Sequence, residues 1–207
     1  KKAEVVAGQV ISISFLISTG IGLLGAVFAS SIVSAIGGTG ELLSEAVGYL
    51  QVIFIGLPTM FLFFSFTAIK QGQGDTLTPM KYGAVSLLMN IILDPIFIFT
   101  FNLGIRGAAI ATVLSRGIFA LYAIYRLSAT NDGSIRISKR LLKPNLKESK
   151  TLLSIALPSS LGQATEAFGF TILTMFVLSF GESTVAAFGI TNRINSLVLM
   201  PAMGIGN

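Results

Sequence analysis

Long apolar runs separated by polar loops are the dominant pattern in this chain. Six runs are long enough, at roughly 20 residues or more, to cross a bilayer as α-helices. They extend over Val5–Ile36, Ala46–Ile69, Tyr82–Phe101, Gly107–Tyr125, Leu152–Phe180 and from Val185 to the end of the sequence. The runs are continuous rather than alternating, which argues against the strands of a transmembrane barrel. The pattern therefore predicts an all-α fold, a polytopic transmembrane helical bundle.

The basic residues give the bundle an orientation. When alternate loops are assigned to opposite sides of the membrane, 11 of the 14 Lys and Arg residues fall on the side of the N-terminus. Among loop residues, only Arg106 falls on the opposite side. Because cytoplasmic loops carry the excess of Lys and Arg, the basic side is expected to be cytoplasmic. The net charge of +5 is thus a topology signal, and the lipid bilayer, not nucleic acid, is the expected partner.

Composition narrows the chemistry. Hydrophobic residues make up 53% of the chain and charged residues only 11%, against about a quarter in soluble domains. The chain has no His and no Cys, which excludes thiolate catalysis, zinc sites and triads that depend on histidine. We therefore predict no enzyme and no cofactor, although a catalytic device built on Ser or Asp stays open.

Four ionisable side chains interrupt the apolar runs, and each costs at least ~2.5 kcal/mol to place at the centre of a membrane. They are Asp94, Arg116, Glu166 and Arg193. The two arginines are interpreted as structural partners of carboxylates or as side chains that extend toward the interface.

Asp94 is the strongest candidate for an ion site. Asn90 and Asp94 are four residues apart and share one helix face. Pro95 has no amide hydrogen, which leaves the carbonyl of Ile91 without its helical donor. Carboxylate, amide and carbonyl oxygens suit a hard cation such as Na⁺, and a desolvated carboxylate could instead take up a proton. The alternative is a structural clamp beside a kink.

Glu166 is the second candidate, in the middle of the fifth run. Its neighbours Ala164, Ala167 and Gly169 are small, which would let a ligand approach closely. We interpret it as a carboxylate that binds a substrate or a cation. The alternative is an ion pair with an arginine on a neighbouring helix.

Two further patterns concern packing and helix ends. Small residues recur every four positions along the first run and predict a close helix contact; they are Ser14, Ser18, Gly22, Ala26, Ser30 and Ser34. Thr78 followed by Pro79 predicts an N-cap at the start of the third helix.

Three sequence blocks together carry a family resemblance. They are Gln73-Gly-Asp-Thr-Leu-Thr-Pro79, Asn90-Ile-Ile-Leu-Asp-Pro95 and Gly104-Ile-Arg-Gly-Ala-Ala-Ile-Ala-Thr112. In this order and spacing they resemble the MATE family of multidrug and toxic compound extrusion transporters. The later Ala156-Leu-Pro158 and Thr191-Asn-Arg-Ile194 also resemble the start of that family's second lobe.

The resemblance implies a fold of twelve helices in two lobes, of which this chain would supply about helices three to eight. Residues 1–127 would be the end of the N-terminal lobe with four transmembrane helices. Residues 128–149 would be a cytoplasmic linker between lobes, exposed and loosely packed. Residues 150–207 would begin the C-terminal lobe with one full and one partial helix.

The resemblance also implies a function and its residues. The chain would be a piece of a monomeric antiporter in the cell's inner (plasma) membrane that exports small organic cations or drugs against Na⁺ or H⁺. Asn90, Asp94 and Thr112 would form the coupling site, with Asn90 and Asp94 as possible Na⁺ ligands. Glu166 would bind the substrate or a cation. The alternative within the superfamily is a flippase for lipid-linked oligosaccharides, which tends to carry more in-membrane Arg and Lys than the two found here.

Overall fold

Six long helices make up almost all of the structure. The computed structural model describes residues 2–129, 139–143 and 145–206, and within these ranges it contains no β-strand. The helices are α1 (Lys2–Ala35), α2 (Gly40–Gly72), α3 (Leu77–Pro95), α4 (Gly104–Ala129), α5 (Leu146–Leu178) and α6 (Glu182–Gly206). A π-helical turn, η1 (Ile96–Thr100), continues α3, and a short 3₁₀ helix, η2 (Lys139–Leu142), precedes α5. The all-α prediction is confirmed.

Among the residues that the structure describes, five helical stretches are long and apolar enough to cross a membrane. Together with α6 they correspond to the six predicted runs, which are shorter than the helices at most ends. Large apolar side chains stay exposed along these helices, as on Val27, Phe99 and Val198. Exposed apolar side chains suit contact with lipid. Helices suit lipid as well, because each helix satisfies its backbone polar groups internally.

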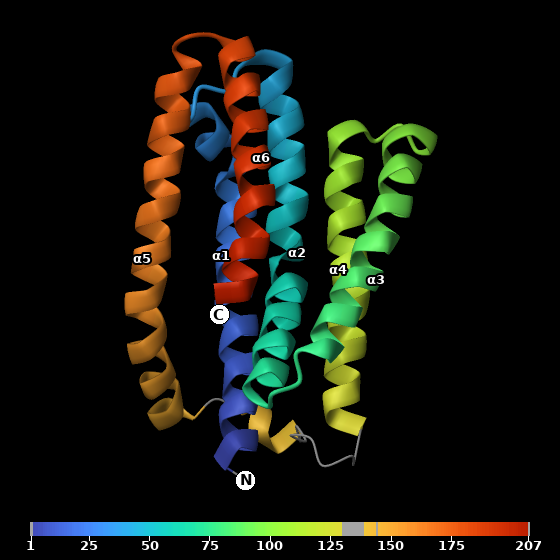
Figure 1. Cartoon of the computed structure of the whole chain (residues 1–207), viewed down its shortest axis with the longest axis vertical. Helices are drawn as coiled ribbons and strands as arrows, with labels where there is room; N and C mark the ends of the chain where they lie inside the picture. The colour runs from blue at the N-terminus through green and yellow to red at the C-terminus, as the bar shows by residue number, and fades with distance from the viewer. Residues whose placement is uncertain (1, 130–138, 144, 207) are drawn as a thin grey trace. The chain divides into compact units, whose positions relative to one another are not determined.

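The chain divides into two compact units, Lys1–Leu153 and Ser154–Asn207. In the first unit, α1 packs on α2, α2 on α4, and α4 on α3, so that neighbouring helices lie side by side in that order (Figure 1). In the second unit, the Phe170 ring on α5 stacks on the Phe188 ring on α6, with ring centroids 5.8 Å apart. Whether these units correspond to the two predicted lobes stays a prediction.

The core of the first unit is built near the predicted cytoplasmic ends of α1, α2 and α4. Phe66 on α2, which is 1% exposed, belongs to the same buried cluster as Ile11 of α1 and Ala123 of α4. Its ring stacks on Tyr82 of α3, with centroids 5.5 Å apart. Small residues on α4 let the bulky rings of α2 approach closely.

The predicted ridge on α1 is only half correct. Ser18 and Gly22 are buried, but the buried face then continues through Gly25, Ala29 and Val33. Ser30 and Ser34 are exposed instead. A spacing of four residues drifts around a helix that has 3.6 residues per turn, so a strict four-residue ridge cannot follow a straight partner for long.

The predicted linker is more closely packed than expected where the structure describes it. The buried side-chain amide of Gln9 on α1 donates to the carbonyls of Leu141 and Lys143, at 3.0 and 2.8 Å. Its carbonyl oxygen accepts from the backbone amide of Asn145, at 2.7 Å. The Ser12 hydroxyl adds a bond to the Leu142 carbonyl, at 2.6 Å.

These bonds hold the end of the linker against α1. Gly8 permits the approach, because an added Cβ would lie 2.6 Å from the Leu141 carbonyl oxygen. The expectation of loose packing is therefore wrong for residues 141–143 and 145, whose backbone groups are bonded to α1, although Lys143 and Asn145 are exposed as expected. The helix α5 begins at Leu146, before the predicted boundary. Residues 130–138 and 144 lie outside the described part.

Candidate functional site

Asn90 and Asp94 lie together on α3, as their spacing predicts. The Asn90 side-chain amide donates to a carboxylate oxygen of Asp94, at 3.1 Å. Both residues are half-buried. Asp94 is the only carboxylate within the membrane-spanning part of α3. Its partner, the side-chain amide of Asn90, can donate or accept a hydrogen bond, depending on its orientation.

The helix changes character directly after Asp94. Pro95 has no amide hydrogen to donate to the carbonyl of Ile91. The amide of the next residue, Ile96, donates to the carbonyl of Leu93, three residues back. The chain then forms the π-helical turn η1, in which the Phe101 amide donates to the Ile96 carbonyl at 3.0 Å. Short π-helical insertions are frequent at functional sites, and this one was not predicted from the sequence.

Gly107 on α4 holds this turn in close contact. An added Cβ at Gly107 would lie 2.7 Å from the carbonyl carbon and oxygen of Phe97. The backbone of η1 therefore rests directly on α4, at a contact that only glycine allows. The position of Asp94 is coupled in this way to the start of the next helix.

Thr112 is the third predicted member of the coupling site. It lies half-buried on α4, and its hydroxyl donates to the carbonyl of Ala108, at 2.9 Å. Within the described residues, Thr112 makes no hydrogen bond to Asp94. Its role in the coupling site stays a prediction.

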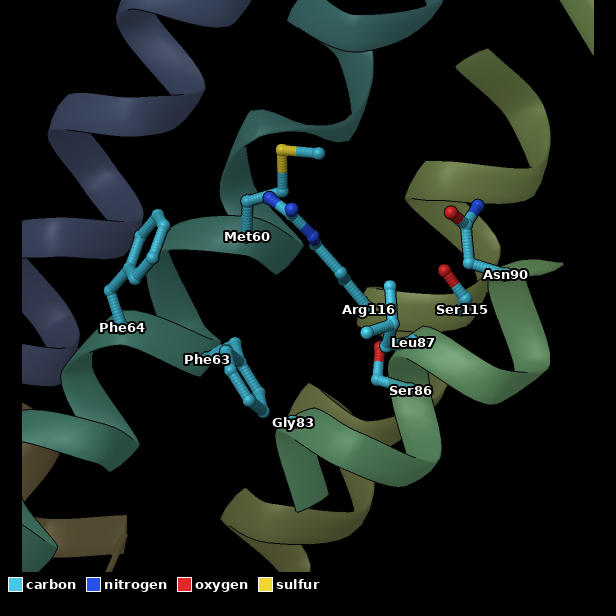
Figure 2. Close-up of a pocket in the computed structure, with 9 residues that line it drawn as sticks. All are labelled: Met60, Phe63, Phe64, Gly83, Ser86, Leu87, Asn90, Ser115 and Arg116. Atoms are coloured by element: carbon cyan, nitrogen blue, oxygen red, sulfur yellow. The ribbon is translucent and has the colours of Figure 1, made fainter. Parts of the chain in front are cut away.

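A cavity of about 260 Å³ opens beside Asn90, between α2, α3 and α4. Its apolar lining comes mainly from α2, through Met60, Phe63 and Phe64. Its polar lining comes from α3 and α4; these residues are Ser86, Asn90, Ser115 and Arg116. Figure 2 shows the Arg116 side chain extending from α4 toward Met60 on α2, while Asn90 lies at the edge of the group. The sequence singled out Arg116 but did not predict a cavity around it.

Oxygen ligands for a small cation are few at this site. Within the residues that the structure describes, no group of three or more His, Cys, Asp or Glu is close enough to hold a metal ion. Asp94 would supply the carboxylate, with the amide oxygen of Asn90 and the carbonyl of Ile91 as neutral ligands. This donor set suits Na⁺ or a proton better than a divalent ion, since it carries one negative charge.

Glu166 lies on α5 in the second unit and is exposed. In the described ranges, no arginine or lysine lies within 4.0 Å of its carboxylate, so the alternative of an ion pair finds no support there. Arg193 on α6 is also exposed. The role of Glu166 stays a prediction.

The first block of the resemblance forms a tight turn between α2 and α3. Gly74 has a φ of +79°, and the amide of Asp75 returns to the carbonyl of Lys70 at 2.9 Å, which closes the end of α2. A carboxylate oxygen of Asp75 accepts from the backbone amide of Thr78, at 3.0 Å. Asp75, rather than the predicted Thr78, therefore satisfies a free amide at the start of α3.

Thr78, through its backbone amide and its side-chain hydroxyl, and Lys70 stabilise the charged form of Asp75. The Thr78 amide contributes most, and the Lys70 ammonium lies 3.5 Å from the other carboxylate oxygen. Together they hold the pKa of Asp75 below its ordinary value of 3.8. The geometry of this turn therefore accounts for Gly74 and Asp75 in the first block of the resemblance.

Long helices with apolar surfaces, and polar side chains grouped between them, define a multi-pass α-helical membrane protein. The family model described as MatE matches residues 1–96 and 158–207. The chain belongs to the MATE family, as the sequence blocks indicated.

Curated relatives agree with this assignment. A probable multidrug resistance protein of Bacillus subtilis (strain 168), YpnP, is 32% identical over 158 residues, which cover 76% of this chain and 35% of the relative. The multidrug export protein MepA of Staphylococcus aureus (strain NCTC 8325 / PS 47) is 30% identical over 178 residues, covering 86% of this chain and 39% of the relative. The chain thus spans less than half the length of these relatives. These relatives are transporters, in agreement with the prediction that the chain is not an enzyme.

Solved structures agree in fold as well. An inward-facing multidrug resistance MATE family transporter of the MOP superfamily superposes with a TM-score of 0.82 at 26% identity, covering 98% of this chain and 52% of that one. A MOP superfamily transporter from Pyrococcus furiosus gives the same TM-score at 27% identity, covering 98% of this chain and 49% of that one.

Proposed function

We propose that this chain forms part of an Na⁺- or H⁺-coupled antiporter that exports small organic cations. The observation that carries the proposal is the hydrogen bond between Asn90 and Asp94, directly before the π-helical turn η1. An ion site at a place where the helix is already irregular can be linked to a change in helix shape. Family membership supports the direction of transport, since relatives are multidrug export and resistance proteins.

The chemistry of coupling begins with the charge on Asp94. In the observed arrangement, the amide nitrogen of Asn90 donates to a carboxylate oxygen of Asp94. A proton on Asp94 would turn the carboxylic acid into a donor, and Na⁺ would need oxygen ligands; either event favours rotation of the Asn90 amide to present its oxygen. Binding therefore changes both the charge and the hydrogen-bond pattern beside η1. A ligand that prefers one of two helix arrangements shifts the population toward it.

Cargo recognition is assigned to Glu166. Its carboxylate is exposed and lies on the same helix as Pro158, so it is available to a cationic ligand in the second unit. Transporters of this kind bind cargo between two lobes that rock around a site near the midplane. We expect the complete protein to act as a monomer in the inner (plasma) membrane.

The flippase alternative requires more positive charge than the chain offers. The predicted apolar runs contain two basic residues, Arg116 and Arg193, against two acidic ones, Asp94 and Glu166. The curated relatives described above are also multidrug proteins. Transport of lipid-linked oligosaccharide is therefore the outcome that would replace our proposal.

The direct test uses the full-length transporter in proteoliposomes. A fluorescent organic cation such as ethidium is loaded, and its exchange is followed while an Na⁺ gradient or a pH gradient is imposed separately. Acceleration by one gradient supports antiport and identifies the ion. Equal rates with and without both gradients would refute ion coupling, and translocation of a labelled lipid-linked oligosaccharide under the same conditions would favour the flippase.

Topology can be tested through the basic linker, although Ser134 lies outside the described residues. The chain has no native cysteine, so Ser134→Cys gives a label site within it. We expect labelling only after reagent enters the cytoplasm. Labelling by an impermeant reagent in intact cells would invert the orientation that the basic residues indicate.

A further inference from the structure

A small polar cavity lies where α2, α3 and α4 meet at their predicted cytoplasmic ends. Its volume is about 120 Å³. Its polar lining consists of Lys70, Asp75, Thr78, Tyr82 and Arg126. The buried side chains of Phe66 and Leu127 complete the lining. Lys70 lies in the last turn of α2 and Arg126 in the last turn of α4, so the cavity brings together basic residues that are 56 positions apart in the chain.

The cavity carries an excess of positive charge. Lys70 and Arg126 bring two cations, and Asp75 is the one acidic residue among those that line it. The Lys70 ammonium, on a side chain that is only 14% exposed, lies 3.5 Å from one oxygen of Asp75. The other oxygen already accepts from the Thr78 amide. An ammonium has three donors and a guanidinium five, so the two cations offer more donors than one carboxylate can accept, and the cavity favours a further anion.

Tyr82 holds the Arg126 side of the cavity in place. Its ring stacks on Phe66 of α2 at 5.5 Å and lies 5.7 Å from the ring of Tyr122 on α4, measured between centroids. The Tyr82 hydroxyl, fixed by these rings, interacts with the Arg126 guanidinium. A guanidinium held in one orientation binds two oxygens of a phosphate through its planar fork, which a mobile side chain does less well.

Location and size both favour a phosphate group as the anion. The basic residues assign this end of the helices to the cytoplasmic leaflet, where anionic headgroups gather, and basic pockets between membrane helices on that side bind such headgroups. A volume of about 120 Å³ is well below the ~300–1,000 Å³ of sites for drug-sized molecules, but far above the ~10–15 Å³ that one water needs. The cavity therefore suits a compact anion and not a cargo molecule.

We propose that this cavity binds a phosphate group at the cytoplasmic surface, with Lys70 and Arg126 as its cationic ligands and Tyr82 as the residue that positions Arg126. A phosphate bound by both cations would bridge the ends of α2 and α4, beside the start of α3. The group comes from the headgroup of an anionic lipid or from free phosphate, and the experiment separates these two sources. The proposal rests on this end of the helices and not on ion coupling at Asp94.

Lipid binding to the full-length transporter tests the site without any transport measurement. The protein in a neutral detergent is titrated with phosphatidylglycerol, which is anionic, or with phosphatidylcholine, which is neutral overall, and native mass spectrometry counts the lipids retained. We expect the first phosphatidylglycerol to bind roughly tenfold more tightly, equivalent to ~1.4 kcal/mol. Without that preference, a thermal midpoint raised by inorganic phosphate, but not by chloride at equal ionic strength, would identify free phosphate as the source. If neither response occurs, the proposal is wrong.

Variants then assign the response to this cavity. Arg126→Gln and Lys70→Gln should each lower the preference for the anionic ligand roughly fivefold, the effect of one cation beside an anionic headgroup. Arg126→Lys keeps the charge but loses the planar fork, so it should retain part of the preference. Lys81→Gln is the matched control, because Lys81 lies on the first turns of α3 but is exposed and does not line the cavity.

Two results would overturn the assignment. An equal loss in Lys81→Gln would mean that the anion is attracted by the basic surface in general. A preference that stays intact in Arg126→Gln, while the thermal midpoint falls, would make Arg126 a structural partner of Tyr82 and nothing more. If Arg126→Gln does not fold, Lys70→Gln and Arg126→Lys decide the question, and an unchanged preference in both would contradict the site.

Discussion

Asn90 donates a hydrogen bond to Asp94 across one helical turn, and Pro95 follows Asp94 directly in the chain. This relationship makes Asp94→Asn a clean test of coupling. The variant keeps the size of the side chain and an oxygen that accepts from Asn90, but it cannot ionise. We expect gradient-driven efflux by the complete transporter to fall roughly 5- to 150-fold, the range of typical coupling free energies.

The control for this experiment is Asp75→Asn, which makes the same chemical change in the turn between α2 and α3. It should retain gradient-driven efflux. Full efflux by Asp94→Asn, at normal expression, would mean that Asp94 is a structural clamp and that coupling resides elsewhere.

Glu166→Gln tests cargo recognition on α5. Loss of the negative charge should weaken binding of a cationic dye roughly tenfold, equivalent to ~1.4 kcal/mol. Dissociation constants measured by fluorescence anisotropy report this directly. Glu148→Gln, at the start of the same helix, is the matched control and should bind normally. Unchanged binding by Glu166→Gln would make Glu166 a structural residue.

Gly107→Ala tests the contact between α4 and η1. The new methyl group would overlap the backbone of Phe97, so η1 must move, and we expect a loss of about 1–3 kcal/mol of stability. Gly83→Ala is the control, because nothing lies within 4 Å of its added Cβ, and alanine in a helix is favoured by about 0.5–1 kcal/mol. Thermal midpoints in detergent should separate the two variants. A stable Gly107→Ala protein would show that η1 is free to shift.

Asp75→Ala tests the cap of α3 through its pH dependence. The pKa of Asp75 is lowered in the folded protein, chiefly by the Thr78 amide, so its carboxylate stabilises the fold above the ordinary pKa near 3.8. That contribution is lost as the pH falls through the lower, folded pKa. The wild type should therefore exceed Asp75→Ala in thermal midpoint at pH 7, and the gap should close in acid. A gap that stays constant down to pH 3 would exclude the charged cap.

Gln9→Leu tests the attachment of the linker to α1. The substitution leaves two carbonyls and the Asn145 amide without their partner, at a cost of about 1–3 kcal/mol. Hydrogen exchange at Asn145 should accelerate about tenfold for each 1.4 kcal/mol lost. Gln51→Leu is the control, since Gln51 makes one exposed, long bond of 3.4 Å to the carbonyl of Ala26. Equal exchange in both variants would contradict the attachment.

Run length and residue spacing were enough to predict the six helices and the pairing of Asn90 with Asp94, because both depend on contacts within a single helix. The π-helical turn was not predictable, since proline alone indicates a kink and not its form. The Gln9 bonds were also missed, because they join residues more than 130 positions apart. The sequence identified Arg116 as a side chain that is costly to place in a membrane. It could not predict the cavity that Arg116 lines, because that cavity depends on how α2, α3 and α4 pack against one another.

The bonds of Gln9 have a consequence for biosynthesis. Its last partner, Asn145, is added to the chain 136 residues later, which at 5–20 residues per second is roughly 7 to 30 s of translation. During this interval α1 must insert with an unpaired carboxamide. Because its partners belong to the predicted cytoplasmic linker, Gln9 lies close to the predicted cytoplasmic surface, where water can hydrate the amide until the linker emerges from the ribosome.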